Sequence, residues 1–413
     1  MMTHTAPRRF GKLSGLRPAY ARQIRRPPQE MSDQMNGRTG DPSALRRLNL
    51  QSVLRVLHSG GVHTISELAQ QAQLSRPTTK QAVDDLVASG WVAATENHRD
   101  ETVIGRPAQA FEFRPGAGYV LGADIGAAKA MVLISDLDGT VVARSRIDVS
   151  PELDPDQRLE ALGGAIDEAL AALGAPIEAV TDAVIATPGT IDREGQVVWG
   201  RAIPGWLGSN PARWVAERYP FRTEGASDMP MAALAEHWRG AATLATGVVY
   251  VHVGRRLGAA ALIGGRPHYG HHGAAIQIGL WRATPWREQY TDLLQLDGDQ
   301  SQSGAPAVFE AAARGDEDAR SRVDALADEL VAGLLPMVIA MDPELLVIGG
   351  GVSAAGEGIA APVRERIRAE TPFAPEVVCS SLGDEAVALG SLRTALDRAE
   401  ERLFAELAPV TRG

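Results

Sequence analysis

The segment GADIGAAKAMVLISDLDG, residues 122–139, determines how the larger part of this chain folds. It joins the end of an apolar run that begins at Tyr119 to a second apolar run, residues 130–134. The small residues Gly126-Ala127-Ala128 lie between the two runs. Apolar runs separated by a short, small-residue turn predict a β-hairpin, and small residues let an anion approach the backbone of the turn. The segment therefore predicts a β-hairpin with a phosphate-loop-like turn.

The sequence around this hairpin has the pattern of an α/β domain. From residue 119 onward, apolar runs alternate with alanine-rich stretches such as residues 157–173. Such alternation is typical of strands and helices that pack in layers. No internal repeat of solenoid period is present. We therefore expect residues 116–413 to form an α/β body.

The composition is that of a globular protein. The 413 residues are enough for two or three domains, and 45% hydrophobic with 22% charged residues exclude a wholly disordered chain. No apolar run approaches the roughly 20 residues that span a bilayer, and the N-terminus lacks the apolar segment of a secretory signal. The single cysteine, Cys379, rules out an intramolecular disulfide. We expect a cytoplasmic protein without a membrane partner.

The charge is distributed unevenly along the chain. Residues 1–115 carry 16 Lys and Arg against 10 Asp and Glu, whereas the remainder carries 25 against 41. A basic front and an acidic body suggest that only the front contacts a polyanion, although chance variation would explain the same numbers. Residues 1–40 contain arginine, proline and glycine without apolar periodicity, which predicts a disordered basic tail. Met31 or Met35 is an alternative start of the chain.

Residues 41–90 contain the signals of three helices. A helix start at Asp41-Pro42-Ser43 precedes an apolar series, and Thr64 with Glu67 forms a capping box for a short second helix. Ser75 is an N-cap for a third helix, in which Val83, Leu86 and Val87 form a buried face. Polar residues near its start are those that a recognition helix presents to the major groove. The expected DNA contacts on this helix are Ser75, Arg76, Thr78, Thr79, Lys80 and Gln81.

A hairpin follows the third helix. Residues 91–95 and 108–113 are strand-like, and Gly105-Arg106-Pro107 lies between them. A glycine-arginine tip can enter a narrow, electronegative minor groove, so Gly105, Arg106 and Pro107 are further expected DNA contacts. Residues 41–115 therefore predict a winged helix-turn-helix that binds double-stranded operator DNA. The alternative is a helix-turn-helix used only for packing or dimerisation.

Together with this front module, the hairpin resembles the ROK family, named for repressors, open reading frames and kinases. The resemblance covers roughly residues 42–395. The other segments that match the family's motifs are residues 187–192 (TPGTID), 203–206 (IPGW), Ser227-Asp228, 232–236 (AALAE) and 342–351 (DPELLVIGGG). The resemblance implies a two-lobed actin-like (ribonuclease H-like) body that assembles as homodimers or homotetramers. We therefore expect residues 116–413 to be a ROK domain for effector binding and oligomerisation.

The chain departs from the family's nucleotide-binding pattern. The positions that the resemblance assigns to the nucleotide are Asp124, Gly126, Lys129, Gly254 and Gly350. Family kinases have Gly-Thr where this chain has Ala127-Ala128, and a glycine-rich loop where it has Arg255-Arg256. These replacements crowd a phosphate and remove a hydroxyl donor. We therefore expect no ATP-dependent activity and no cofactor.

The sugar side of the pattern is altered as well. The resemblance places the effector at Gly205, Trp206, Ser227, Asp228, His271, His272 and Gln277. Asp228 occupies the general-base position, but we interpret it as vestigial because Gln277 replaces a sugar-binding carboxylate. Leu280 replaces a zinc-binding histidine, and the three zinc-ligating cysteines are absent. We expect no metal there, nor at the histidines of the 268–272 loop, because a loop does not bring them together.

Three functions fit these features. The first is a DNA-binding repressor of carbohydrate-related genes. A sugar or phosphosugar effector would control it by binding to a catalytically inactive kinase-like body. The second is an active ROK sugar kinase with a DNA-binding appendage; Ala127-Ala128 and Arg255-Arg256 disfavour it. The third is a ligand-independent regulator whose cleft serves only oligomerisation.

Overall fold

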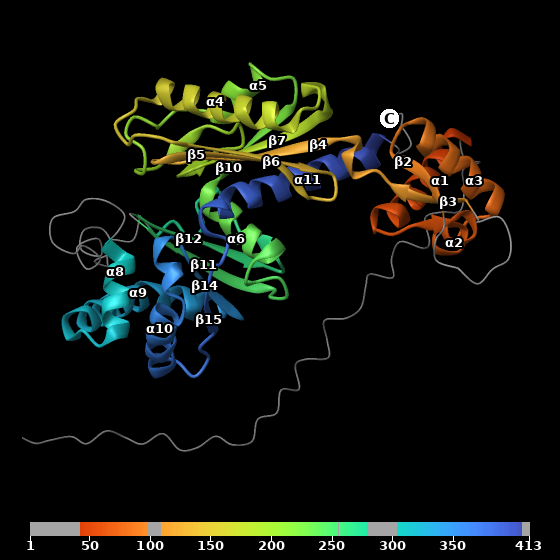
Figure 1. Cartoon of the computed structure of the whole chain (residues 1–413). Coiled ribbons are helices and arrows are strands. Elements are labelled where there is room, and N and C mark those ends of the chain that lie inside the picture. The colour runs from red at the N-terminus through yellow and green to blue at the C-terminus, as the bar shows by residue number, and fades with distance from the viewer. Residues whose placement is uncertain (1–41, 97–108, 255, 279–303, 407–413) are drawn as a thin grey trace, which may run out of the picture.

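The computed structural model describes residues 42–96, 109–254, 256–278 and 304–406. Three units follow one another along the chain (Figure 1): an N-terminal module, a first α/β lobe and a second α/β lobe, with a long C-terminal helix that runs between them. The described strands form two five-stranded sheets, one three-stranded sheet and one two-stranded sheet. The α/β body predicted from the alternating apolar runs is therefore confirmed. None of the described helices is long and apolar enough to cross a membrane.

The N-terminal module consists of helices packed on a small antiparallel sheet. Its elements are α1 (Pro42–His58), β1 (His63–Thr64), α2 (Ile65–Gln71), α3 (Arg76–Ala88), β2 (Val92–Glu96) and β3 (Gln109–Phe113), with sheet order β1-β3-β2. The capping box of α2 forms as predicted: the Thr64 amide donates to Glu67 Oε2 at 2.7 Å, and the Glu67 amide donates to Thr64 Oγ1 at 3.3 Å. Ser75 caps α3 by accepting the Thr78 amide at 3.3 Å.

The core of the module is apolar, and one residue that was predicted for it is exposed. Leu54, Leu57 and Val83 are fully buried. The i, i+4 spacing placed Val87 on the buried face of α3, but its side chain is 39% exposed. The helix contacts the core through Val83 and Leu86 instead. The expectation for Val87 was therefore wrong. Arg46 of α1 forms a bidentate pair with Asp85 of α3 at 2.8 and 2.7 Å, which ties the two helices together at the surface.

The first lobe is a mixed sheet covered on both faces. Its elements are η1 (Pro115–Ala117), β4 (Tyr119–Ile125), β5 (Lys129–Asp136), β6 (Val141–Asp148), α4 (Pro155–Leu173), η2 (Ile177–Ala179), β7 (Val180–Thr187), β8 (Thr190–Ile191), β9 (Val197–Trp199), α5 (Pro211–Ala216) and β10 (Arg222–Ser227). The sheet order is β10-β7-β4-β5-β6. The predicted hairpin is confirmed: β4 and β5 pair antiparallel, with Gly122 opposite Leu133 and Ile125 opposite Ala130. Helix α4 covers one face and α11 (Ala386–Glu406) the other (Figure 1).

The second lobe repeats this layered arrangement. Its elements are α6 (Asp228–Arg239), β11 (Gly247–Val253), β12 (Leu257–Ile263), β13 (Arg266–Pro267), α8 (Gly304–Arg314), α9 (Glu317–Met341), β14 (Leu345–Gly349), η5 (Gly351–Ala355), α10 (Glu357–Glu370), β15 (Glu376–Cys379) and η6 (Gly383–Glu385). The sheet order is β13-β12-β11-β14-β15. Helices α9 and α10 pack with its Val249 and Val251 face. Helix α6 packs on the other face, between the two sheets (Figure 1).

Helix α11 joins all three units. It runs from the space between the lobes, under the sheet of the first lobe, to the N-terminal module (Figure 1). Its approach to β4 and to α6 is so close that only glycine fits at the contacts. A Cβ on Gly122 would lie 2.4 Å from the Ala388 carbonyl oxygen, and one on Gly390 would lie 1.8 Å from the Met231 carbonyl oxygen. At the far end, His58 Nε2 of α1 lies 3.8 Å from Glu400 Oε1.

We expect Gly390→Ala to lower the free energy of unfolding by about 3 kcal/mol, because the new methyl group forces α11 and α6 apart. Chemical denaturation of the purified chain measures this effect. Gly351→Ala is the matched control, since a Cβ at Gly351 meets nothing within 4 Å. Equal stability of the two variants would show that α11 and α6 do not approach as closely as described.

Candidate functional site

A cluster of ionisable residues lies where the two lobes meet. Asp124 is near the end of β4, Lys129 begins β5 and Asp228 begins α6. Lys129 Nζ lies 3.5 Å from Asp124 Oδ2, and it also donates to the Asp384 carbonyl in η6. His252 is near the end of β11 and contributes to the same cluster. The structure therefore brings together the predicted residues Asp124, Lys129 and Asp228.

Burial dominates the electrostatics of this cluster. It raises the pKa of Asp228 to about 8, with a further contribution from the charge of Asp124. Burial also raises the pKa of Asp124, although the ammonium of Lys129 opposes the shift. The pKa of His252 falls to about 4 because of burial and of the nearby Lys129 charge. At neutral pH the Asp228 carboxyl is therefore mostly protonated and the His252 ring is neutral.

Two predicted glycines are held at the same end of the second lobe. A Cβ on Gly254 would lie 2.7 Å from His252 Nε2. Gly350 has a φ of +82°, and a Cβ there would lie 2.4 Å from the Val253 carbonyl oxygen. Glycine is required at Gly350 by its positive φ and by the backbone of Val253, whereas a methyl group at Gly254 would displace the His252 ring. Gly126 closes the β4–β5 turn by donating its amide to the Lys129 carbonyl at 2.9 Å.

The residues predicted for the sugar side take different roles. Trp206 is only 3% exposed, and its Nε1 donates to Thr187 Oγ1 at 2.8 Å, so its indole belongs to the core of the first lobe. Gly205 next to it has a φ of +70° and packs against Pro155. Ser227 is buried at the N-cap of α6, beside Asp228. Because the Trp206 ring is buried and its N–H already has a partner, it is not placed to contact a ligand directly.

The histidine loop reaches the first lobe. The rings of His271 and His272 are exposed and touch edge to face, with centroids 4.5 Å apart. A Cβ on Gly273 would lie 3.1 Å from the Ile191 carbonyl oxygen of β8. Gln277, four residues further on, is half-buried. Among the described residues, no group of three His, Cys, Asp or Glu side chains is placed to hold a metal ion. Leu280 lies outside those residues.

Helix α3 presents most of its predicted polar residues to solvent. Ser75, Arg76, Lys80 and Gln81 are exposed and Thr78 is half-buried. Thr79 is fully buried, and its hydroxyl donates to the Ser75 carbonyl at 3.0 Å, so it is not available to DNA. The expectation for Thr79 is corrected on this ground: it lies on the side of the helix that packs with Ala82 and Val83. Gly105, Arg106, Pro107 and residues 1–40 lie outside the described residues.

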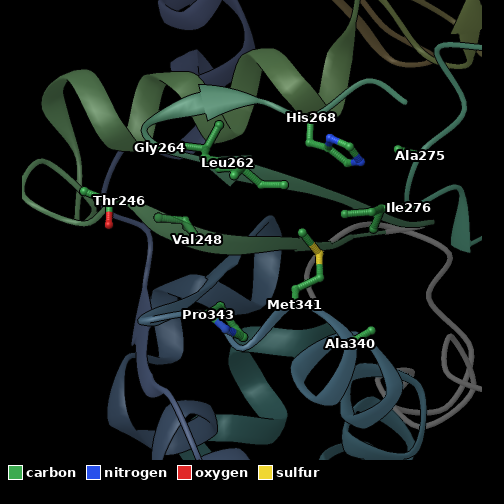
Figure 2. Close-up of a pocket in the computed structure, with 12 residues that line it drawn as sticks. Thr246, Val248, Leu262, Gly264, His268, Ala275, Ile276, Ala340, Met341 and Pro343 are labelled. Atoms are coloured by element: carbon green, nitrogen blue, oxygen red, sulfur yellow. The ribbon is translucent and has the colours of Figure 1, made fainter. Parts of the chain in front are cut away.

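Figure 2 shows a pocket of about 630 Å³ whose lining includes no residue of the ionisable cluster. It is lined by Val248 at the start of β11, Leu262 at the end of β12, and Met341 at the end of α9. Val248 lies near the start of β11 and His252 near its end, so the pocket and the ionisable cluster are at opposite ends of this strand. His268 and Thr246 are its only lining residues with polar side chains among those described. We therefore take the ionisable cluster, and not this apolar pocket, as the candidate site.

Sequence reasoning missed His252, Asp384 and Arg158 as residues of the candidate site. His252 stands two residues before Gly254, so a polar residue at the end of a buried strand was an available signal. Asp384 contributes a backbone carbonyl, for which side-chain patterns carry no signal. Arg158 of α4 donates to the Gly126 carbonyl of the β4–β5 turn at 2.7 Å, and its spacing in the helix indicated nothing about that contact.

We expect Asp228→Asn to stabilise the protein increasingly as the pH rises from about 4 to about 8. Over this range the folded wild type holds a proton on Asp228 that the unfolded chain has released, so its stability falls with pH. An amide has no such dependence. Thermal unfolding at pH 5 and pH 8 measures the difference, with a gain of about 3 °C or more at pH 8. Asp156→Asn, at an exposed position, is the control; an equal shift at both pH values for Asp228→Asn would contradict the raised pKa.

Comparison with known proteins places the fold in one family. The chain matches the ROK family over residues 120–288 and 287–398. It is 20% identical over 386 residues to the xylose repressor of Caldicellulosiruptor bescii, a match that covers 86% of this chain and 96% of the repressor. It is also 24% identical over 307 residues to the glucokinase of Thermotoga maritima, covering 66% of this chain and 95% of the kinase.

Solved structures of both kinds share the fold. The crystal structure of a ROK family transcriptional regulator, a homolog of the E. coli MLC protein, superposes with a TM-score of 0.67 at 20% identity, covering 88% of this chain and 99% of that one. A ROK family glucokinase from Streptomyces griseus, in complex with glucose and AMPPNP, superposes with a TM-score of 0.57 at 24% identity, covering 68% of this chain and all of that one. This chain belongs to the ROK family.

Proposed function

We propose that this protein is a DNA-binding transcriptional regulator of carbohydrate-related genes, acting as a repressor. Residues 42–113 form a winged helix-turn-helix that binds operator DNA, and the two-lobed body binds a sugar or sugar-derived effector. The observation that carries the proposal is the surface of α3. Its first turns expose Arg76, Lys80 and Gln81, while Val83 and Leu86 are buried on the opposite side. A helix built in this way can enter the major groove with its N-terminal end.

The hairpin beside α3 supports the same proposal. Strands β2 and β3 pair antiparallel from Val92 opposite Phe113 to Glu96 opposite Gln109. The connection between them therefore contains Gly105-Arg106-Pro107, the glycine-arginine tip that we propose as the wing. Such a tip suits the minor groove because arginine is attracted to its negative potential.

The extent of the similarities also favours a regulator. Glucokinases match about two thirds of this chain over nearly their whole length. The xylose repressor and the transcriptional regulator match 86% and 88% of it. The additional fifth of the chain corresponds in size to the N-terminal module. A homodimer or homotetramer would present two such modules and favour a roughly palindromic operator.

The cleft supports a sugar-like effector without phosphoryl transfer. Related solved structures hold glucose with AMPPNP in one case and sucrose in another. In this chain Gln277 replaces a carboxylate, and Ala127-Ala128 replace a glycine and a threonine, of the pattern that the family's kinases have. Loss of those groups removes transition-state contacts, and binding of an effector between the lobes does not need them.

We expect Arg76→Ala to weaken binding to a DNA site selected by the full-length protein from random duplexes by roughly 5- to 100-fold, because one base or phosphate contact is lost. Asp84→Asn should act in the opposite direction, by about twofold to fivefold. Asp84 pairs with Lys80 at 2.7 Å and repels phosphates, so its neutralisation frees the Lys80 ammonium for DNA. Fluorescence anisotropy with the selected duplex measures both affinities.

The control is Arg213→Ala, because Arg213 is exposed on α5 of the first lobe. Its affinity for DNA should equal that of the wild type. If Arg76→Ala and Asp84→Asn both bound like the wild type, α3 would not be the DNA-contacting helix. Failure to select any duplex would count against DNA binding as a whole.

A sugar kinase is the second candidate, favoured by one observation. The pKa of Asp228, at about 8, is close to the working pH that suits a general base. A coupled assay with ATP, Mg²⁺ and a panel of hexoses tests this function. We expect no sugar-dependent turnover above that of Asp228→Asn. Turnover that is present in the wild type and lost in Asp228→Asn would establish the kinase instead.

A further inference from the structure

A second pocket, of about 510 Å³, lies where the N-terminal module meets the first lobe. The module and the segment that follows it contribute most of the lining, and the turn between β5 and β6 of the first lobe contributes Asp138. The lining residues from the module side are Leu57, residues 60–62, Ala93 and residues 112–116. Because module and lobe both line this pocket, which we call the joint pocket, a molecule bound in it contacts both.

Three charged side chains line the joint pocket without pairing with one another. Glu112 and Asp138 carry carboxylates and Arg114 carries a guanidinium, yet no ion pair joins any of the three to a described residue. Neither carboxylate accepts a hydrogen bond from the described part of the chain. Arg114 makes one side-chain hydrogen bond there, a long one of 3.4 Å to the Gly90 carbonyl. Charges of both signs are therefore available to a ligand of this pocket.

The surroundings of Asp138 favour a cation beside it. Partial burial raises the pKa of Asp138, and the charge of Asp136 adds to the shift, while the nearby His58 opposes it. A raised pKa shows that the carboxylate lacks compensation for its negative charge. An ammonium group supplies that charge and has three hydrogen-bond donors, enough to reach Glu112 in the same pocket as well.

The rest of the lining determines what else the ligand carries. A guanidinium binds a carboxylate through two parallel hydrogen bonds, so the free Arg114 side chain suits an acidic group. Leu57 and Phe113 are buried in the lining and offer an apolar surface. The volume lies within the range of roughly 300 to 1,000 Å³ of pockets that hold small molecules. A neutral sugar has neither charge, and a sugar phosphate has no ammonium group.

We propose that the joint pocket is a second ligand site, which binds a free amino acid with an apolar side chain and thereby adjusts the affinity of the protein for DNA. A ligand that contacts both module and lobe stabilises the arrangement in which both contacts are made. The amino acid and the DNA then change each other's affinity by the same factor. The effect on DNA rests on the proposed function, whereas binding of the amino acid does not.

Isothermal titration calorimetry of the full-length protein with the standard amino acids tests the site. We expect saturable binding of phenylalanine or leucine, or of another apolar member of the set, with about one molecule per chain. Phenylpropionate lacks the ammonium group of phenylalanine, and phenethylamine lacks its carboxylate. Each of these analogues, or the matching pair for leucine, should bind about tenfold more weakly than the amino acid. Binding of no amino acid would overturn the proposal.

Charge variants assign the two ends of the ligand. Arg114→Gln should remove the preference for the amino acid over its amine, and Asp138→Asn should reduce the preference over its acid. Both side chains are exposed, so neither replacement removes core packing. Arg213→Gln on α5 is the control and should leave both preferences unchanged. Wild-type preferences in the Arg114 and Asp138 variants would contradict the assignment of the pocket.

A variant that fills the pocket tests its position independently of charge. Ala93 lines the pocket, whereas Ala94 is exposed and lies on the other face of β2, because side chains alternate along a strand. Ala93→Phe should weaken amino-acid binding by about tenfold or more, and Ala94→Phe should not. Equal affinities of the two phenylalanine variants would place the bound molecule elsewhere and refute the site.

The effect on DNA is measured by fluorescence anisotropy with the selected duplex, with and without a saturating concentration of the amino acid. We expect the DNA affinity of the wild type to change by roughly fivefold or more and that of Ala93→Phe to stay the same. Amino-acid binding that leaves the DNA affinity of the wild type unchanged would refute the regulatory role of the pocket. Failure to select any duplex, with the amino acid still bound, would count against the proposed regulator and support the ligand site.

Discussion

The contact on which this structure depends is the backbone-to-backbone packing of α11 between β4 and α6. The lack of a side chain at Gly122 lets the backbone of α11 contact β4. The lack of a side chain at Gly390 lets the backbone of α6 contact α11. Asp124 lies two residues beyond Gly122 on the same side of β4, because side chains alternate along a strand. Asp228 begins the helix that packs on α11. The approach that requires two glycines therefore also brings the two carboxyls of the ionisable cluster together, and the charge of Asp124 adds to the burial that raises the pKa of Asp228.

The same helix connects the ionisable cluster with the N-terminal module. Asp384, two residues before α11, accepts a hydrogen bond from Lys129, and Glu400 near its end lies beside His58 of α1. One buried cluster includes Leu57 of the module and Leu403 of α11. In the proposed regulator, an effector changes DNA affinity only if it binds two conformations with different affinity. Helix α11 has one end at the ionisable cluster and the other at the N-terminal module. It is therefore the described element best placed to couple a change in one to a change in the other.

Local signals in the sequence predicted the elements better than the contacts between them. The capping box at Thr64, the N-cap at Ser75 and the hairpin at residues 122–139 depend on residues close in the chain, and all three form. Thr79 was misplaced because helical spacing does not say which neighbour covers a face. His252 and Arg158 were missed because their partners come from other elements. Gly122 and Gly390 were not singled out, because a glycine in the sequence does not show which element approaches it.

Phosphoryl transfer makes stricter demands on the altered loops than ligand binding does. Transfer requires the phosphate, the metal and the attacking hydroxyl to be held within a few tenths of an ångström of a productive arrangement, so the loss of a threonine hydroxyl or a glycine is severe. Binding requires only donors and a favourable charge. In the turn at Ala127-Ala128 the guanidinium of Arg158 donates to the carbonyls of Gly126 and Ala127, at 2.7 and 3.1 Å. Side-chain replacements on the turn leave these backbone contacts in place, so the turn can keep its shape although it lacks groups that phosphoryl transfer needs.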